Sequence, residues 1–591
     1  MRKRTGLCLA ALLLCALAPH AMGDERMDCL TDKAMYAPNE TVVCQVLNTP
    51  ENTACLRACL THLEAEPVLR LTVLCGETLS FTMPETDFTG YLLTVQALDE
   101  KGETLALCRC GVDCSSVWTR FPRYGYVWDF TKGADAEGKI AAMTRMHLNG
   151  VQFYDWQYRH HIPVSPDLNG WKDWTGRLIS GDVLNAYIGA AHARGMACLE
   201  YNMIYAANET YLTDGSGVDP AWRLVRPDGK DFTCEMDKRL GAVGVLQFFN
   251  PLNEGWQRYI FEREREVFGA FAFDGWHGDT IGEAGRMCAA DGGPLGYDAD
   301  GLPVHLVKNC YTQFLNAAKA AIGDKKYLVF NPVGAQGLEN VCVSDADVLY
   351  AEFWPWDKNP DGVPYVSYAS LKDAIEEAAR LSGGKSLVVA AYVNYRNPAP
   401  YFNAPAVRLM DCVTFAAGGA RIELGNGVNM LSDEYFPADR NKRMDEKLQC
   451  AVTGLYDFAV AYENLLRDGQ RPVSRTVLID GQAAGTQGQA GQVWCFARAD
   501  DRYEIYHFIN LTGTDAAWRD EAQTKNAPAV LQSLKTRLYT DFDAARAFLA
   551  SPDGDDIAPR ALPFTAGRDE KGRYIELTMP ELQYWNMIFL R

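Results

Sequence analysis

The chain has 591 residues, and its 76 acidic side chains outnumber its 57 basic ones to give a formal net charge of −19. This charge disfavours nucleic acid and anionic membrane surfaces as partners, because both attract basic proteins. The length is too great for one hydrophobic core, so we expect several domains.

Residues 1–23 have the pattern of a secretory signal peptide. Arg2, Lys3 and Arg4 are followed by an apolar run and then by the small-residue segment Ala21-Met22-Gly23. The apolar run is too short to span a bilayer, and no later segment reaches that length. We therefore expect an exported protein, in the periplasm, at the cell surface or outside the cell, with no membrane span.

Residues 24–116 are predicted to form an immunoglobulin-like β-sandwich. Short alternating segments such as ETVVCQVL, LRLTVL and GYLLTVQAL are separated by turn residues. Eight cysteines crowd this region, and in an exported domain such crowding favours disulfides over zinc. These cysteines are Cys29, Cys44, Cys55, Cys59, Cys75, Cys108, Cys110 and Cys114.

Residues 117–468 change to strands that alternate with helices, which predicts a central (β/α)8 TIM barrel in a multidomain α/β protein. The chemistry of such a barrel lies at the carboxyl ends of its strands. The eight strands are expected near residues 124–130, 151–156, 196–205, 272–279, 327–331, 348–353, 386–393 and 420–424.

Residues 469–591 return to short strands, such as QVWCFARA, RYEIYHFIN and YWNMIFLR. The spacing predicts a C-terminal antiparallel β-sandwich of Greek-key type. No internal repeat or low-complexity run interrupts it.

The segment FDGWHGDTIG, at the end of the fourth predicted strand, is the most informative motif of the chain. Asp279 lies two residues after His277, among glycines that let the backbone approach a ligand. A carboxylate beside aromatic rings suits a sugar-cleaving site, although an acidic strand end can also be a solvated turn. We interpret Asp279 as one carboxylate of such a site and His277 as a substrate-binding or orienting residue.

A second carboxylate, Glu352, lies in the run VLYAEFWPW. Its aromatic surroundings should raise its pKa and suit it to general acid catalysis near neutral pH. The alternative is a buried glutamate paired with an arginine. Trp354 and Trp356 are predicted to stack on sugar rings, and the two carboxylates together indicate glycoside hydrolysis.

Polar and aromatic residues after other strands are further substrate-binding candidates, since such side chains grip sugar hydroxyls and ring faces. The adjacent His160 and His161 could suggest a metal, but neighbouring side chains rarely point at one ion and no carboxylate or cysteine follows at ligand spacing. We expect no metal and no cofactor. The candidates are Asp155, Trp156, Tyr158, His160, Tyr201, Asn202 and Asn331.

The chain resembles glycoside hydrolase family 66, the dextranases and cycloisomaltooligosaccharide glucanotransferases. The segments that carry the resemblance are RYGYVWDF, NGVQFYDWQYRHH, FFNPLNEGWQRYI, FDGWHGDTIG, VLYAEFWPW and ELQYWNMIFLR. They occur in family order over nearly the whole mature chain. The resemblance implies that Asp279 is the nucleophile and Glu352 the acid/base.

The resemblance also implies a substrate, dextran, cut internally at α-1,6 linkages with retention to give isomaltooligosaccharides. Retention requires the two carboxyl groups to lie about 5–5.5 Å apart. The alternative within the family is cyclising transfer, whose enzymes carry a large carbohydrate-binding insertion after the seventh barrel strand; here the next helix follows Val393 within about a dozen residues. A non-catalytic glucan-binding protein is a third possibility, which the presence of both carboxylates disfavours.

Overall fold

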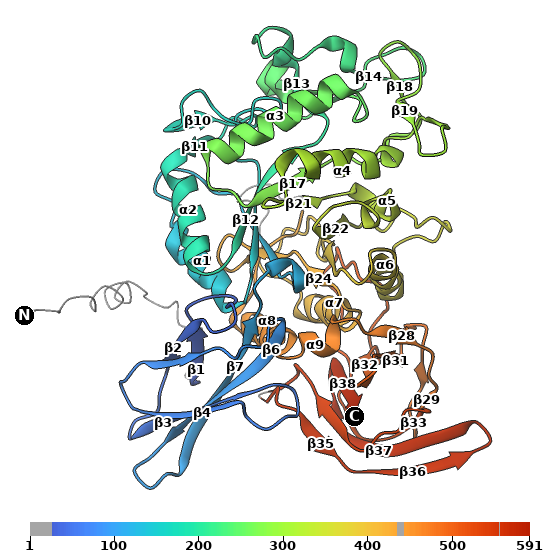
Figure 1. The fold of residues 1–591 in the computed structure, drawn as a ribbon. Helices are drawn as coiled ribbons and strands as arrows, with labels where there is room; N and C mark the ends of the chain where they lie inside the picture. The colour runs from blue at the N-terminus through green and yellow to red at the C-terminus, as the bar shows by residue number, and fades with distance from the viewer. Residues whose placement is uncertain (1–25, 434–441, 555) are drawn as a thin grey trace, which may run out of the picture.

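The computed structural model describes residues 26–433, 442–554 and 556–591. The predicted signal segment, residues 1–23, lies outside the described residues. Figure 1 shows a central region covered by helices, with the N-terminal and C-terminal β regions side by side at one end of it. Glu64 joins these two regions, because it accepts a hydrogen bond from the Tyr503 hydroxyl and pairs with Arg591. Within the described ranges, no helix is long and apolar enough to cross a membrane.

The N-terminal region consists of two packed antiparallel sheets. Alternate side chains of each strand point inward, as Leu56, Ala58 and Leu60 do, and the two inner faces enclose one apolar cluster. One sheet has the order β1 (Asp28–Thr31), β2 (Thr41–Leu47), β5 (Leu79–Thr82). The other has the order β4 (Leu69–Leu74), β3 (Cys55–Thr61), β6 (Thr89–Leu98), β7 (Thr104–Cys114).

The cysteines of this region are free thiols, so the prediction of disulfides is wrong for this structure. For two of the cysteines the strand register gives the reason. Cys55 lies opposite Leu74 and Leu98, and Cys59 lies opposite Arg70 and Thr94. Most of the other cysteines, including Cys29 and Cys110, fill the core as small apolar side chains.

The central region is built on a curled parallel sheet, and strands lie at all eight predicted positions. The eighth position holds two short pieces: β24 (Ala420–Arg421) pairs with β23 (Leu387–Ala390), and β25 (Leu424–Gly425) pairs with β8 (Tyr124–Val127). The sheet therefore curls back towards its first strand. In order, the strands are β8 (Tyr124–Val127), β9 (Gly150–Phe153), β12 (Ala197–Met203), β17 (Gly275–Asp279), β21 (Tyr327–Phe330), β22 (Val348–Glu352), β23 (Leu387–Ala390), β24 (Ala420–Arg421) and β25 (Leu424–Gly425).

The two faces of this sheet differ in chemistry. Phe153 and Phe330 pack outward against the helices, whereas Tyr201 and Tyr350 pack inside the curl. Because strand side chains alternate, a residue two positions beyond an inward one also points inward at the strand end. Polar residues at the carboxyl ends of these strands therefore lie inside the curl, at one edge of the sheet.

Helices cover the outer face, as Figure 1 shows. Side-chain caps fix where several of them begin: Asp135, Asn253 and Asp445 each accept a hydrogen bond from the first turn of the helix that follows. Ser367 and Ser370 form a capping box. The helices are α1 (Ala136–Arg145), α2 (Gly181–Ala193), α3 (Glu254–Ala270), α4 (Tyr311–Ile322), α5 (Leu338–Cys342), α6 (Tyr368–Leu381), α7 (Ala404–Ala416), α8 (Glu446–Ala461) and α9 (Glu463–Leu466).

Short strands and 3-10 turns line the connections of the central region. The longest excursion lies between β12 and α3 and includes β13, β15 and β16, which pair as a small sheet. The connection strands are β10 (Gly170–Lys172), β11 (Leu178–Ser180), β13 (Ala206–Asn208), β14 (Leu224–Val225), β15 (Thr233–Glu235), β16 (Val245–Phe248), β18 (Cys288–Ala289), β19 (Gly296–Tyr297), β20 (Pro303–Val304), β26 (Asn429–Met430) and β27 (Lys442–Arg443).

The C-terminal region has two sheets around a separate apolar cluster that includes Phe508, Leu538 and Ile588. Its strand pairs are antiparallel apart from β30 with β31. One sheet contains β28 (Arg471–Val473), β30 (Ala484–Gly485), β31 (Val493–Ala499), β32 (Glu504–Asn510), β34 (Ala547–Ala550), β35 (Arg560–Leu562) and β38 (Trp585–Leu590). The other contains β29 (Val477–Ile479), β33 (Leu531–Tyr539), β36 (Phe564–Asp569) and β37 (Gly572–Leu582).

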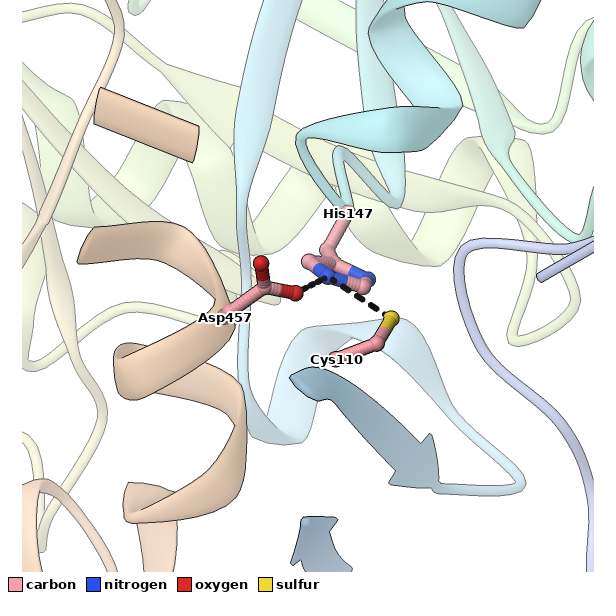
Figure 2. A group of neighbouring side chains, drawn as sticks. All are labelled: Cys110, His147 and Asp457. Carbon is pink, nitrogen blue, oxygen red and sulfur yellow. Dashed lines mark hydrogen bonds and ion pairs between the residues drawn. The ribbon is translucent and has the colours of Figure 1, made fainter. Parts of the chain in front are cut away.

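Helix α8 joins the N-terminal sandwich to the central region through a buried polar cluster (Figure 2). His147 Nε2 lies 2.7 Å from Asp457 Oδ1 and 3.9 Å from Cys110 Sγ. Burial lowers the pKa of His147, but its bonds to Asp457 and Cys110 outweigh burial and raise it to about 9. Asp457 also pairs with Arg145, so this cluster is a charge network that ties the regions together.

Candidate active site

Two carboxylates end two strands of the curled sheet. Asp279 is the last residue of β17 and Glu352 the last of β22, with only β21 between those strands. Since the three strands are parallel, their carboxyl ends meet at one edge. Asn331, directly after β21, lies between the two carboxylates.

Asp279 is held by three donors. Its Oδ2 accepts the Tyr201 hydroxyl at 2.7 Å, and its Oδ1 accepts Asn331 Nδ2 at 2.9 Å and the Thr280 backbone N–H at 2.8 Å. Burial raises the pKa of Asp279 to about 6, although these hydrogen bonds lower it. Asp279 is thus a fixed carboxylate that is largely ionised at neutral pH.

Glu352 has a higher pKa than Asp279. Burial first, and then the negative charge of Asp279, raise the pKa of Glu352 to about 8, against the hydrogen bonds from Tyr392 and Asn331. Glu352 is therefore mostly protonated at neutral pH and can donate a proton. No arginine pairs with it among the described residues, unlike the alternative considered from the sequence.

Asn331 bridges the two carboxylates. Its Nδ2 lies 2.9 Å from Asp279 Oδ1 and 3.4 Å from Glu352 Oε2, and its Oδ1 accepts the Glu352 backbone N–H at 3.2 Å. Because one nitrogen contacts both carboxylate oxygens, those oxygens cannot be further apart than the sum of its two distances. The two carboxylates are therefore close neighbours, as a pair that acts on one glycosidic bond must be.

Asp155 belongs to the Asp279 side of the site. Its Oδ1 accepts Trp174 Nε1 at 3.0 Å, and its backbone carbonyl accepts Arg177 Nη2 at 2.7 Å. Burial raises the pKa of Asp155 to about 7, Arg177 opposes this rise, and the charges of Asp173 and Asp279 add to it. The predicted residues Asp155, Tyr201 and Asn331 thus gather around Asp279.

Four predicted binding residues lie elsewhere. Trp156 is fully buried between Trp171 and Phe271 on the helix side of the sheet, because β9 ends at Phe153 and the chain turns at Asp155, where φ is 50°. Tyr158 packs against the same outer core, with Arg159 over its ring. The prediction that Trp156 contacts sugar is therefore wrong, whereas the half-buried Tyr158 stays a prediction.

His160 and Asn202 also face away from the carboxylates. They bond to each other, and Asn202 Nδ2 donates to Glu264 Oε1 on α3 at 3.0 Å. Strand alternation is the reason: Tyr201 points inward, so Asn202 points outward. These two residues hydrogen-bond each other and α3 on the outer face of the sheet. The prediction that they contact the substrate is therefore wrong.

His277 lies inside the curl, beneath Asp279. Its Nδ1 lies 3.0 Å from the Tyr124 hydroxyl, its ring stacks on Tyr124, and Tyr350 meets it edge-on. Burial lowers the pKa of His277 to about 3, so the ring is neutral at any working pH. It can therefore order the interior below Asp279, but it cannot supply charge.

An aromatic cluster covers the Glu352 side. Trp354 stacks on Trp356 with 5.0 Å between their ring centres, and its ring centre lies 5.3 Å from that of Tyr392 and 5.1 Å from that of Tyr395. Trp356 is 60% exposed, whereas Trp354 is buried. We call Trp354, Trp356, Tyr392 and Tyr395 the aromatic platform.

The sequence profile of glycosyl hydrolase family 66 matches residues 31–589. The chain belongs to this family. The match confirms the resemblance inferred from its motifs and makes this family 66 chain a glycoside-cleaving or glycosyl-transferring enzyme.

Relatives of this family 66 chain carry two different names. A cycloisomaltooligosaccharide glucanotransferase of Niallia circulans is 27% identical, over 95% of this chain and 72% of its own length. A dextranase of Streptococcus salivarius is also 27% identical, over 86% of this chain and 68% of its own length. This chain is therefore equally similar in sequence, at 27% identity, to a relative named as a glucanotransferase and to one named as a dextranase.

A solved structure covers the family 66 chain nearly end to end. It is a Paenibacillus sp. cycloisomaltooligosaccharide glucanotransferase complexed with cycloisomaltoheptaose, with a TM-score of 0.83 and 26% identity. It covers 95% of this chain and 99% of its own. The multidomain architecture, mostly β with helices on a curled sheet, is thus shared with that enzyme.

Sequence reasoning missed Tyr392, Tyr395 and Arg519 of this family 66 site. Tyr392 and Tyr395 follow β23 in the run AAYVNY, and the rule used elsewhere, aromatic residues after a buried strand, would have found them. Arg519 comes from the C-terminal region and lies over the Trp356 ring at 5.0 Å. No local pattern could reveal that contact.

Two side-chain groups in the described ranges have the composition of metal ligands, and neither lies at the carboxylate pair. His192, Cys198 and Asp274 gather at the amino end of β17, where Asp274 bonds His192 and the Cys198 backbone. In the group Cys110, His147 and Asp457, the polar atoms already hydrogen-bond one another, and Asp457 also pairs with Arg145. Both groups are explained by hydrogen bonding within the protein.

Proposed function

We propose that this protein is a retaining endo-dextranase, which hydrolyses internal α-1,6-glucosidic linkages of dextran to isomaltooligosaccharides. The observation that carries the proposal is the bridge from Asn331 Nδ2 to Asp279 Oδ1 and Glu352 Oε2. A shared hydrogen-bond donor brings one oxygen of each carboxylate to the same place, which supports a double displacement in which one carboxylate is the nucleophile.

In the first step Asp279 attacks the anomeric carbon while Glu352 protonates the departing glycosidic oxygen. A glycosyl ester forms on Asp279, and the glycosidic bond breaks. In the second step ionised Glu352 takes a proton from water, which attacks the anomeric carbon and frees Asp279. The lower pKa of Asp279 and the higher pKa of Glu352 match these roles near neutral pH.

The surrounding residues set the protonation states for this cycle. Tyr201 and Asn331 donate to Asp279, which keeps it ionised before attack. Once the ester has formed, Asp279 loses its charge, and the pKa of Glu352 falls because that charge was one of the causes that raised it. Glu352 can then act as a base in the second step.

At the level of the fold, we infer that the curled sheet is a (β/α)8 TIM barrel, because the two short pieces at its eighth position pair with β23 and with β8. An immunoglobulin-like sandwich over residues 24–116 and a Greek-key domain over residues 469–591 complete the proposed architecture, with the catalytic region over residues 117–468. Export by residues 1–23 would bring the enzyme to an extracellular polysaccharide.

Hydrolysis is favoured over cyclisation by the connection after the seventh strand. Only residues 391–403 separate β23 from α7, which leaves no space there for an inserted binding module. The alignment with the Niallia glucanotransferase spans 722 positions to cover 95% of this 591-residue chain, so that relative carries residues which this chain lacks. The second candidate is cyclising transfer, which the close structural similarity to the Paenibacillus enzyme favours.

The test is incubation of the purified protein with dextran and, separately, with starch, followed by sizing of the products. We expect dextran to fall rapidly in mean size and to yield linear isomaltooligosaccharides, while starch stays intact. Cyclic products as the main outcome would support the second candidate, and cleavage of starch alone would contradict the proposed α-1,6 specificity.

A further inference from the structure

A long connection of the C-terminal region runs along the carboxyl edge of the curled sheet. It lies between β32 and β33, and hydrogen bonds anchor it to segments that follow β22 and β23. Trp518 Nε1 donates to the Tyr365 carbonyl at 2.6 Å, and the Asp520 backbone N–H donates to the Val393 carbonyl at 2.7 Å. This connection is therefore held beside the candidate active site.

Arg519, between those two anchors, projects onto the aromatic platform. Its guanidinium lies 4.3 Å from the ring centre of Tyr395, 5.0 Å from that of Trp356 and 5.5 Å from that of Trp354. Its Nε lies 2.6 Å from Glu521 Oε1, and its side chain is only 7% exposed. Its Nε and Nη1 are buried and neither makes a hydrogen bond of good geometry to the described residues, although Nε forms the ion pair with Glu521.

A buried guanidinium nitrogen without an acceptor requires an explanation, because buried donors in folded proteins are nearly always satisfied. Arginine only donates hydrogen bonds, and a sugar hydroxyl accepts them. The neighbouring Trp356 is 60% exposed and offers a ring face on which a pyranose can stack. Arg519 and Trp356 together thus have the two functions of a sugar subsite, a flat apolar surface and a donor at its edge.

We propose that Arg519 is a substrate-binding residue, so that the C-terminal region builds part of the glucan site. The inference rests on the proposed function, and it specifies which side of that site is concerned. Trp354 contacts Tyr392, which in turn hydrogen-bonds Glu352. Since Glu352 protonates the departing oxygen, the sugar bound on this side is the leaving group.

The same position receives the acceptor when a sugar, rather than water, attacks the glycosyl ester. Arg519 and Trp356 therefore raise the local concentration of a competing acceptor. We infer that they set the ratio of transfer to hydrolysis as well as the affinity for dextran.

The test compares two donors with the full-length enzyme. Dextran places a sugar on the Glu352 side, whereas α-isomaltosyl fluoride has a fluoride leaving group and places none there. For Arg519→Ala we expect kcat/KM on dextran to fall about ten-fold and kcat/KM on the fluoride to stay within about two-fold, the size expected from one lost charged hydrogen bond. Transfer to added isomaltose should fall together with dextran cleavage.

Arg573→Ala is the matched control, since Arg573 lies in the same C-terminal region and pairs on the surface with Asp543. Arg519→Lys keeps the charge but loses the planar fork, and Trp356→Ala removes the exposed ring while the hydrogen-bond anchors of the connection stay in place; both should reproduce the selective loss. A thermal melt within about 2 °C of the wild type would show that folding is intact.

Equal loss on both donors, or no loss on either, would overturn the role of Arg519 in an enzyme that is otherwise active on dextran. A wild-type protein that cleaves neither donor would instead overturn the proposed function. These two failures are distinguishable because the first is seen only in the variants.

Discussion

The two sides of the candidate active site hold their carboxylates in different ways. On the Asp279 side, Tyr201 and Asn331 lie at the ends of neighbouring strands and fix both carboxylate oxygens by hydrogen bonds of 2.7 and 2.9 Å. On the Glu352 side, residues after β22 and β23 form the aromatic platform, and Arg519 joins it from another region of the chain.

This difference suits the two tasks of the retaining mechanism that we propose. The nucleophile must be aligned with one atom, the anomeric carbon, and a regular sheet provides that precision. The acid/base must serve first a departing sugar and then a water molecule or an incoming sugar, so its surroundings include an exposed, sugar-sized surface. Loops and a second region can vary this surface without disturbing the sheet.

The largest expected effect is the loss of the nucleophile. Asp279→Asn should lower kcat on dextran by roughly 10⁴–10⁶-fold, because an amide cannot form the glycosyl ester. Dextran binding and the melting temperature should change little, since the amide oxygen can still accept a hydrogen bond. A folded Asp279→Asn protein with near wild-type turnover would show that Asp279 has no role in the mechanism. Mass spectrometry would check that the asparagine has not deamidated back to aspartate.

The acid/base should show a substrate-dependent loss. Glu352→Gln should lower kcat on dextran by roughly 10²–10⁴-fold, whereas the first step with a fluoride leaving group should be much less affected. Azide should restore turnover of the fluoride by replacing the water that needs a base. Equal losses on both donors without azide rescue would indicate that Glu352 is structural.

The acid limb of the pH profile should respond to changes beside Asp279, and the alkaline limb to changes beside Glu352. Activity requires Asp279 ionised and Glu352 protonated, so it should rise with pH near about 6 and fall near about 8. Tyr201→Phe removes a bond that lowers the pKa of Asp279, so the acid limb should move up by about one pH unit. Tyr392→Phe should instead move the alkaline limb up. If both variants moved the same limb, the assignment of the two sides would be wrong.

The smallest expected effect is on chain binding. Trp356→Ala should weaken binding of long isomaltooligosaccharides about five- to ten-fold, as one stacking contact suggests, and weaken binding of short ones less. Titration by tryptophan fluorescence measures this. Trp156→Ala is the contrasting variant: it should lower the melting temperature, because a buried ring is removed from the core, without a preference between chain lengths.

The sequence predicted the parts of the site that depend on strand ends. Asp279 and Glu352 follow apolar runs in parallel strands, so their position at one edge follows from strand order alone. Trp156 was misplaced because the backbone turn at Asp155, with φ of 50°, breaks the alternation after β9. Asn202 was misplaced although alternation with Tyr201 would have placed it correctly.

Contacts between distant regions could not be predicted. Arg519 reaches the platform through a connection whose anchors, such as Trp518 to Tyr365, join segments far apart in the chain. The disulfide prediction failed in two ways: Cys55 and Cys59 face no cysteine across their strands, whereas Cys29 lies near Cys44, Cys108 and Cys110 and all four pack as free thiols.

Trapping of the covalent intermediate tests the central claim most directly. Glu352→Gln should react with α-isomaltosyl fluoride and, lacking its base, accumulate a glycosyl ester that mass spectrometry of proteolytic fragments can locate. We predict an added isomaltosyl mass on the fragment that contains Asp279, and its loss when azide is added. An adduct on another carboxylate, or an inverted first product without any adduct, would contradict the account.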